Sequence, residues 1–152
     1  MSVACPVDRL ADLAGTTLGS SDWHPVTQDL VDTFAGATGD GQWIHTDPCR
    51  AAAGPFGTTV AHGYLTLAML TRMLAEVVEV TGVDLVLNKG LDRLRFSAPV
   101  PVGSRVGAEV EVVSVRARPR RFWEVRYGVT VRIEGQRTAA LAAEAIFLYQ
   151  QG

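Results

Sequence analysis

The sequence predicts an α+β fold in which an antiparallel β-sheet wraps around one long central α-helix. An almost continuous apolar run from Thr59 to Val80 has the length of a buried helix. After Gly82 the pattern changes to an alternation of apolar and polar residues with a period of two, which is typical of half-buried strands. These alternating segments follow one another closely, and successive strands joined by short turns form an antiparallel sheet.

The length and composition indicate a single globular domain that spans residues 1–152. The chain is 47% hydrophobic and 20% charged, which is ordinary for a soluble domain with a substantial core. Its net charge of −2 and pI of about 5.9 provide no general attraction to nucleic acid or to an anionic membrane. We therefore expect neither of these as a partner.

The sequence favours a cytoplasmic protein. Cys5 and Cys49 have no C-x-x-C spacing, which argues against a disulfide framework or a zinc site and suits a reducing compartment. The first eighteen residues do not form an export signal, because charged residues interrupt them (Asp8, Arg9 and Asp12). The long apolar run also contains charges (Arg72, Glu76 and Glu79), so it predicts a buried helix and not a membrane span.

The first third of the chain predicts short elements. Residues 1–14 form either a short helix or an ordered arm, and a strand is expected around Trp23 within Thr16–Val26. Thr27 is a suitable N-cap for a helix from Gln28 to about Ala37, with Gly36 and Gly39 ending it. Three residues make its expected apolar face: Leu30, Phe34 and Ala37.

Asp47-Pro48 predicts the start of another helix, because an N-cap carboxylate is followed by proline at the first helical position. That helix is expected over Pro48–Ala53, and residues 54–57 break it. The long helix is then expected from Thr59 to Val80, about 33 Å in length, with its charges on one stripe.

Four strands are expected after the long helix. They cover Leu85–Phe96, Arg105–Val115, Trp123–Ile133 and Thr138–Tyr149. An interruption of the first is predicted near Asn88-Lys89-Gly90, because glycine and asparagine are poor strand formers. Residues 99–103 connect the first two strands, and Gly135 marks a hairpin between the last two.

Most of the polar chemistry lies between Phe34 and Thr71. Asp40 and His45 are five residues apart, so on an α-helix they would point about 140° away from each other. They converge only if residues 39–46 form a turn, which Gly39 and Gly41 permit. An aspartate between two glycines also has a plainly structural interpretation as an Asx turn.

Two segments resemble the MaoC-like dehydratases, the (R)-specific enoyl-CoA hydratases. These are Ala37-Thr-Gly-Asp40-Gly-Gln-Trp-Ile-His45-Thr-Asp47-Pro and Pro55-Phe-Gly-Thr-Thr-Val-Ala-His62-Gly63. The resemblance covers a core of about residues 26–149 and includes the later segment from Gly90 to Gly103. It implies the hot-dog fold, in which an antiparallel sheet curls around a long helix.

The resemblance implies reversible hydration of a trans-2-enoyl-CoA to the (R)-3-hydroxyacyl-CoA. His45 would take a proton from water while Asp40 positions that water and serves the α-carbon proton, or the two roles are exchanged. The backbone N–H of Gly63, at the start of the long helix, would stabilise the enolate oxygen. The acyl chain would run beside the helix in an apolar tunnel.

Six further residues are candidates for binding substrate: Gln42, Trp43, His62, Thr71, Asn88 and Arg95. Gln42 and Trp43 replace the Asn-Pro of the broader family, and Lys89 stands where many relatives have tyrosine. His62 is also interpreted as a hydrogen-bonding support for the turn. The hydroxyl of Thr71 either serves the site or bonds back to the carbonyl of Leu67.

The resemblance predicts no metal and no redox cofactor, with coenzyme A present only as part of the substrate. A homodimer is expected because half of such a sheet leaves an edge exposed, and the site would lie close to the dimer interface. A carrier-protein thioester is the alternative substrate. Four arginines around Pro119 are either a contact for phosphate or carrier protein or a solvated hairpin tip (Arg116, Arg118, Arg120 and Arg121).

Two rival functions remain open at this stage. A hot-dog thioesterase shares the fold and directs water at the thioester carbonyl. A non-catalytic module would bind acyl thioesters without turnover.

Overall fold

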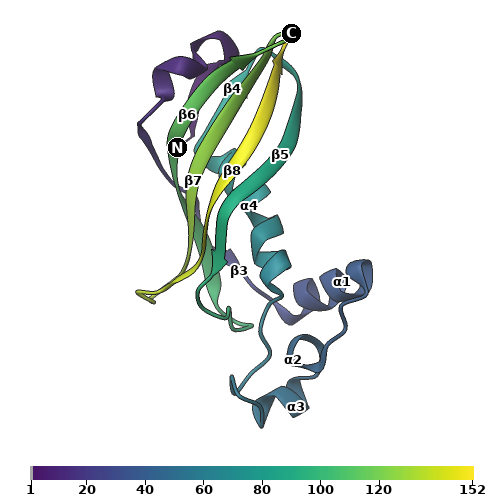
Figure 1. The fold of residues 1–152 in the computed structure, drawn as a ribbon. Helices are drawn as coiled ribbons and strands as arrows, with labels where there is room; N and C mark the ends of the chain where they lie inside the picture. The colour runs from purple at the N-terminus through teal and green to yellow at the C-terminus, as the bar shows by residue number, and fades with distance from the viewer. Residues whose placement is uncertain (1) are drawn as a thin grey trace.

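A computed structural model, which describes residues 2–152, contains a six-stranded antiparallel sheet that curls around one long helix, α4 (Gly63–Val77) (Figure 1). The main path of the sheet runs β2 (Thr17–Ser20), β6 (Arg105–Arg118), β7 (Phe122–Ile133), β8 (Ala139–Gln151) and β5 (Val83–Phe96), and β3 (His24–Pro25) also pairs with β6. The predicted fold class is confirmed.

The alternation along β7 explains why the sheet packs on α4. Val125, Tyr127, Val129 and Val131 are buried in the core, while Arg126 and Thr130, which alternate with them, are partly exposed on the other face. The helix contributes apolar side chains to the same core (Leu65, Leu70, Met73, Leu74 and Val77). Burying each such side chain stabilises the fold by about 1.5–3 kcal/mol.

The long helix is shorter than the expected span of Thr59–Val80. Before it, Val60 and Ala61 are extended, because their N–H groups donate to the carbonyls of Ile44 and Val100. After it, the chain forms β4 (Val78–Thr81), which pairs in parallel with β1 (Val3–Pro6). The apolar run thus combines an extended entry, a helix and a strand, and the helix is about 22 Å long.

The sheet order differs from a simple succession of neighbouring strands. β5 pairs with β8 and not with β6, so the segment after Phe96 crosses from one edge of the main path toward the other. The register of β5 shifts between Asn88 and Gly90, which confirms the predicted interruption. The connection from Ser97 to Ser104 is therefore a crossover and not a short turn.

The N-terminal expectations are partly right. β1 is followed by a 3-10 helix, η1 (Val7–Leu13), so residues 1–14 contain a strand besides the expected helical turn, with Met1 outside the described residues. Trp23 lies between β2 and β3 and belongs to neither. Both cysteines are free thiols.

The helix α1 (Gln28–Thr38) begins as predicted, because the hydroxyl of Thr27 accepts a hydrogen bond from the Leu30 N–H at 3.1 Å. It continues past Gly36 and ends at Gly39, which adopts φ = +78°. Ala37 is exposed, so its assignment to the apolar face is wrong; Val31 and Ala35 are the buried residues.

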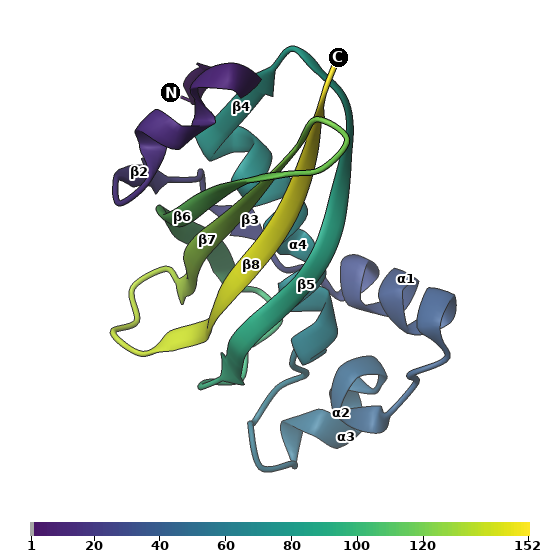
Figure 2. The same ribbon diagram turned by 45° about the horizontal axis from the view of Figure 1, so that its top comes forward.

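Two short helices follow α1. The helix α2 (Trp43–Thr46) forms the predicted turn, and α3 (Pro48–Ala52) begins at Asp47, whose carboxylate accepts from the Arg50 N–H at 2.9 Å. Together, α1, α2 and α3 lie beyond the end of the sheet and near the N-terminal end of α4 (Figure 2). Among the helices of residues 2–152, none is long and apolar enough to cross a membrane.

Candidate active site

His45 is held in one orientation by the fold. It lies on α2 with 7% of its surface exposed, and its Nδ1 is 2.6 Å from the backbone oxygen of Val60. Because a carbonyl oxygen only accepts hydrogen bonds, Nδ1 carries the proton and donates it. The other ring nitrogen, Nε2, is therefore the one available as a base.

The backbone of His45 is also held in place. The side-chain amide of Gln28 donates to the His45 carbonyl at 2.7 Å, and its oxygen accepts from the Thr59 hydroxyl at 2.6 Å. Gln28 thereby connects α1, α2 and the segment before α4. The sequence does not reveal this role, because Gln28 resembles any other glutamine in the first turn of a helix.

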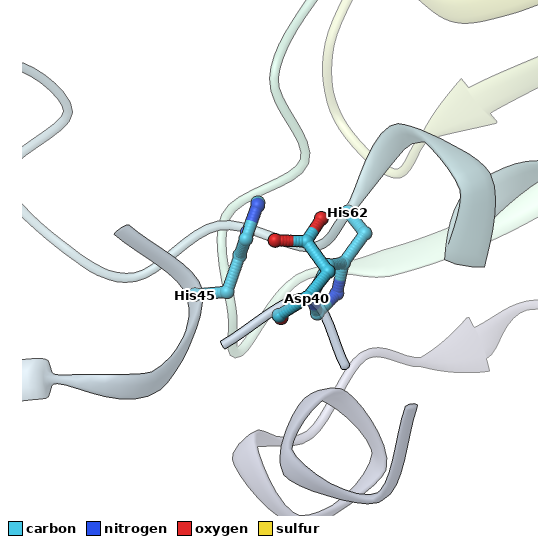
Figure 3. A group of neighbouring side chains, drawn as sticks. All are labelled: Asp40, His45 and His62. Atoms are coloured by element: carbon cyan, nitrogen blue, oxygen red, sulfur yellow. The ribbon is translucent and has the colours of Figure 1, made fainter. Parts of the chain in front are cut away.

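Asp40 follows the left-handed turn at Gly39, and its side chain is exposed. One ligand atom from each of Asp40, His45 and His62 lies within 4.8 Å of the other two. Figure 3 shows the carboxylate of Asp40 close to the side chains of both histidines. The predicted convergence of Asp40 and His45 is therefore present, and a single water molecule can bridge groups at this separation.

His62 is buried with 2% of its surface exposed, and it contacts both of the other groups. Its Nε2 donates to the backbone oxygen of Asp40 at 2.9 Å, and its ring stacks on that of His45 with centroids 3.8 Å apart. This hydrogen bond agrees with the expected support for the turn. A direct contact of so deeply buried a ring with substrate stays a prediction.

Asp40, His45 and His62 are also residue types that bind metal ions, and their ligand atoms lie close together. However, the rings of His45 and His62 are nearly parallel, with 25° between their planes. The lone pairs of imidazole nitrogens lie in the ring plane, so in stacked rings they run side by side and do not meet at one point. This geometry suits hydrogen bonding to water better than coordination of a cation.

Gly63 is the first residue of α4, as predicted, and His62 is its N-cap. Within residues 2–152 its N–H donates to no acceptor, which leaves it at the positive end of the helix dipole. A Cβ at this position would lie 3.1–3.2 Å from three atoms of the Phe96 ring. Any larger residue at position 63 would press on this ring, so glycine suits the position. The sequence does not reveal the contact with Phe96.

A cavity of about 330 Å³ lies beside Gly63 and is bordered by Phe96 and Thr66. Neither Asp40 nor His45 is among the residues that line this cavity. Asp40, His45 and His62 form the cluster in Figure 3, and Gly63, the residue after His62, lines the cavity.

Thr71 and Asn88, predicted separately from the sequence, line one cavity of about 300 Å³ between α4 and β5. Apolar side chains form much of its wall (Leu67, Leu70, Leu91, Ile146 and Phe147). The Thr71 hydroxyl makes no hydrogen bond within the described part of the chain, so the alternative bond to Leu67 is not formed.

Lys89 also borders this cavity, and its amine is bonded to Glu124 across the sheet. Glu124 accepts two more hydrogen bonds from Arg118, at 3.0 and 3.1 Å. The bonds from Arg118, and next those from Lys89, lower the pKa of Glu124 from 4.5 to about 2. The residue that replaces the family's tyrosine therefore has a structural partner.

In residues 2–152, no side-chain hydrogen bond or ring contact joins the remaining candidates, Gln42, Trp43 and Arg95, to Asp40, His45 or His62. Gln42 is exposed at the N-cap of α2. The ring of Trp43 packs against Gly54 and lies 4.4 Å from the guanidinium carbon of Arg50. Arg95 is exposed and donates to the neighbouring Leu94 carbonyl at 2.8 Å. Their contacts with substrate stay predictions.

The arginine-rich hairpin lies at the far end of the sheet from α2 (Figure 1). Since β6 has 14 residues, the tip is about 40 Å from the end that adjoins the site. Arg118 pairs with Glu124, and Arg121 donates to the carbonyl of Gly152. Within one protomer the hairpin is therefore too distant to contact a thioester held at Asp40.

Comparison with known proteins agrees with this geometry. A model of the MaoC like domain matches residues 9–133. The chain is 51% identical over 143 residues to the 3-hydroxyacyl-thioester dehydratase Z of Mycobacterium tuberculosis, covering 94% of this chain and 95% of that protein. It is 41% identical over 143 residues to nodulation protein N of Rhizobium meliloti, covering 93% and 89%.

A solved structure of an R-hydratase from Pseudomonas aeruginosa superposes with a TM-score of 0.73. The two chains are 24% identical, and the superposition covers 91% of this chain and 83% of the other. The two chains therefore share the fold.

Proposed function

The chain belongs to the family of MaoC-like dehydratases, and from this premise we propose that it reversibly hydrates a trans-2-enoyl-CoA to the (R)-3-hydroxyacyl-CoA. It is a hydro-lyase with the hot-dog fold. The observation that carries the proposal is that the buried imidazole of His45 lies close to the exposed carboxylate of Asp40. The bond from His45 to Val60 fixes which ring nitrogen is free.

Water is added by His45 and Asp40 acting together. Nε2 of His45 takes a proton from the bridging water as the water oxygen bonds to the β-carbon, and the π electrons move toward the thioester oxygen. His45 then passes this proton to the Asp40 carboxylate, and Asp40 transfers it to the α-carbon. Hydroxide and proton are thus delivered from one water molecule, and both side chains end in the state in which they began.

The amide of Gly63 stabilises the enolate that forms between these two steps. Its N–H has no acceptor among residues 2–152 and lies at the first turn of α4. A hydrogen-bond donor of this kind stabilises the transition state by roughly 3–4 kcal/mol. The closeness of Phe96 supports this role, because glycine leaves room for the thioester to approach the amide beside the ring.

No cofactor is needed for this chemistry. Hydration neither oxidises nor reduces the substrate overall, and the proton transfers are made by side chains. Coenzyme A is present only as the thiol part of the thioester substrate and stays attached throughout, and a carrier-protein thioester is the alternative form. A cytoplasmic location stays a prediction.

The protein is proposed to act as a homodimer joined through β5. This strand has β8 on one side, and its other edge is unpaired within residues 2–152. Four apolar residues along it are 39–47% exposed (Leu85, Val86, Leu87 and Leu91). A long, apolar, unpaired edge is a site of association, and pairing two copies through it would bury these side chains. It would also close the cavity that contains Thr71 and Asn88.

The proposal is tested with crotonyl-CoA and longer 2-enoyl-CoAs. Enzyme activity removes the enoyl absorbance, and the product should be the (R)-3-hydroxyacyl-CoA by chiral analysis. Asp40→Asn and His45→Gln should each lower kcat by about 10²–10⁴-fold. His24→Gln is the matched control, because His24 is equally buried but bonds to Glu76 near the other end of α4.

The same experiment separates the two rivals. A thioesterase releases free thiol without removing the enoyl absorbance. A binding module binds the acyl-CoA without turnover, and its affinity is indifferent to Asp40→Asn and His45→Gln. Absence of hydration across the panel would reject the proposed function.

A further inference from the structure

We propose that His62 is a positioning residue whose imidazole fixes Asp40, His45 and the Gly63 amide relative to one another. This inference rests on the proposed hydratase function and assigns His62 a part in it. It differs from a direct substrate contact, because the ring is only 2% exposed and packs on His45 and Phe34.

The first contact fixes Asp40. The Nε2–H of His62 donates to the Asp40 backbone oxygen at 2.9 Å. The only other recorded hydrogen bond of Asp40 in residues 2–152 is a long one, 3.4 Å from its N–H to the Thr38 hydroxyl. Glycines on both sides allow this residue many backbone conformations. The bond from His62 is therefore the main restraint on the Asp40 backbone from which the carboxylate projects.

The second contact fixes His45. Its ring stacks on His62 at 3.8 Å, while the ring of Phe34 lies 4.9 Å from His62. His62 therefore has an aromatic neighbour in addition to the catalytic imidazole. The stacking sets the plane of the His45 ring, and the hydrogen bond to Val60 sets the rotation of the ring within that plane. Together they fix the position of Nε2 of His45.

The third link is covalent. His62 is the N-cap of α4, and its carbonyl accepts from the N–H groups of Leu65 and Thr66 at 3.1 Å. The N–H of Gly63 belongs to the peptide bond that joins it to His62. The residue that holds the carboxylate and the imidazole is therefore rigidly joined to the amide proposed for the enolate oxygen.

Packing alone does not explain why this residue is a histidine. Nδ1 of His62 is buried and has no hydrogen-bond partner in the described residues. An unpaired buried acceptor is unfavourable, and phenylalanine would fill the same space without one. What phenylalanine lacks is the Nε2–H that holds Asp40.

The test compares variants that separate these contacts. His62→Phe keeps an aromatic ring and removes the donor, and we expect kcat for crotonyl-CoA to fall about 10–100-fold with KM changed less than about twofold. His62→Gln and His62→Met have similar length and both lose the stacking, but only glutamine has a donor near the position of Nε2. We expect His62→Gln to retain about tenfold more kcat than His62→Met.

The controls distinguish positioning from stability and from a wrong function. Thermal unfolding is followed for every variant, and His24→Gln should keep the wild-type kcat whatever its Tm. An unchanged kcat in His62→Phe, or equal kcat in His62→Gln and His62→Met, would overturn the proposed role while leaving the hydratase function intact. If His62→Phe does not fold, the glutamine and methionine pair decides. Inactivity of the wild type would instead reject the function itself.

Discussion

Glu124 provides the sharpest prediction about stability. It lies on β7 with 7% of its surface exposed, and it accepts hydrogen bonds from Arg118 on β6 and Lys89 on β5. It therefore joins strands on either side of it in the sheet, including the interrupted part of β5 that borders the cavity with Thr71. We consider the change Glu124→Gln, which keeps the shape and removes the charge.

The size of the effect follows from the pKa of Glu124, which folding lowers from 4.5 to about 2. Such a shift corresponds to at most about 3 kcal/mol at neutral pH, since each unit is worth 1.36 kcal/mol. Water screens the partly exposed Arg118 and Lys89, so we expect a loss of about 1–2 kcal/mol in the variant.

The pH dependence has a definite sign. The folded state binds the Glu124 proton more weakly than the unfolded state does. The carboxylate therefore contributes its full stability above pH 4.5, and loses it as the pH falls toward about 2. The wild type should lose more stability than Glu124→Gln over this interval.

Urea denaturation at pH 7, 5 and 3 measures the difference in the free energy of unfolding. Glu134→Gln is the control, because its ion pair with Arg105 is long at 3.4 Å and both side chains are exposed, so its effect should be below about 0.5 kcal/mol. Equal stability of Glu124→Gln and wild type at pH 7, or a difference that does not shrink at pH 3, would refute the reasoning.

Three further predictions concern the site, the dimer and a helix cap. Gly63→Ala should change the free energy of unfolding by less than about 1 kcal/mol, because the half-exposed Phe96 ring is free to move. It keeps the backbone N–H but should lower kcat/KM about 10–100-fold, because the added Cβ and the shifted ring displace the thioester from that N–H; near-normal hydration of crotonyl-CoA would contradict it. The double variant Val86→Lys, Leu87→Lys places a charge on each face of the unpaired edge of β5. Light scattering should then give the mass of a 16.3 kDa monomer instead of a dimer, and an unchanged mass would place the interface elsewhere. Thr27→Ala should cost about 1 kcal/mol in urea denaturation with kcat unchanged, because the cap of α1 is lost, and an unaffected midpoint would contradict that estimate.

The sequence predicted those features that depend on short-range patterns. Thr27 and Asp47 are recognisable as caps because their side chains bond to N–H groups only three residues away. The alternation along β7 is visible because each side chain takes the opposite face from its neighbour. The turn that joins Asp40 to His45 was predicted from glycines directly beside it.

The features that were missed depend on partners far away in the chain. The long helix was predicted to reach Val80, because an apolar run does not reveal that residues 78–81 pair with β1. The alternation Val-Glu-Val-Thr in these residues was the one local signal of a strand. Phe96 lies on Gly63 only because β5 folds back beside α4.

His62 shows the same limit within the site. Its position next to Gly63 was visible, and so was a supporting role for the turn. The stacking on His45 depends on how α2 packs against the start of α4, which no spacing in the sequence encodes.

A crystal structure of the inactive Asp40→Asn variant with crotonyl-CoA tests the central claim most directly. We expect the β-carbon of the substrate to lie next to the gap between His45 Nε2 and the side chain of residue 40. The thioester oxygen should lie within hydrogen-bond distance of the Gly63 N–H. A thioester bound with its oxygen turned away from Gly63, or with its double bond distant from His45, would contradict it.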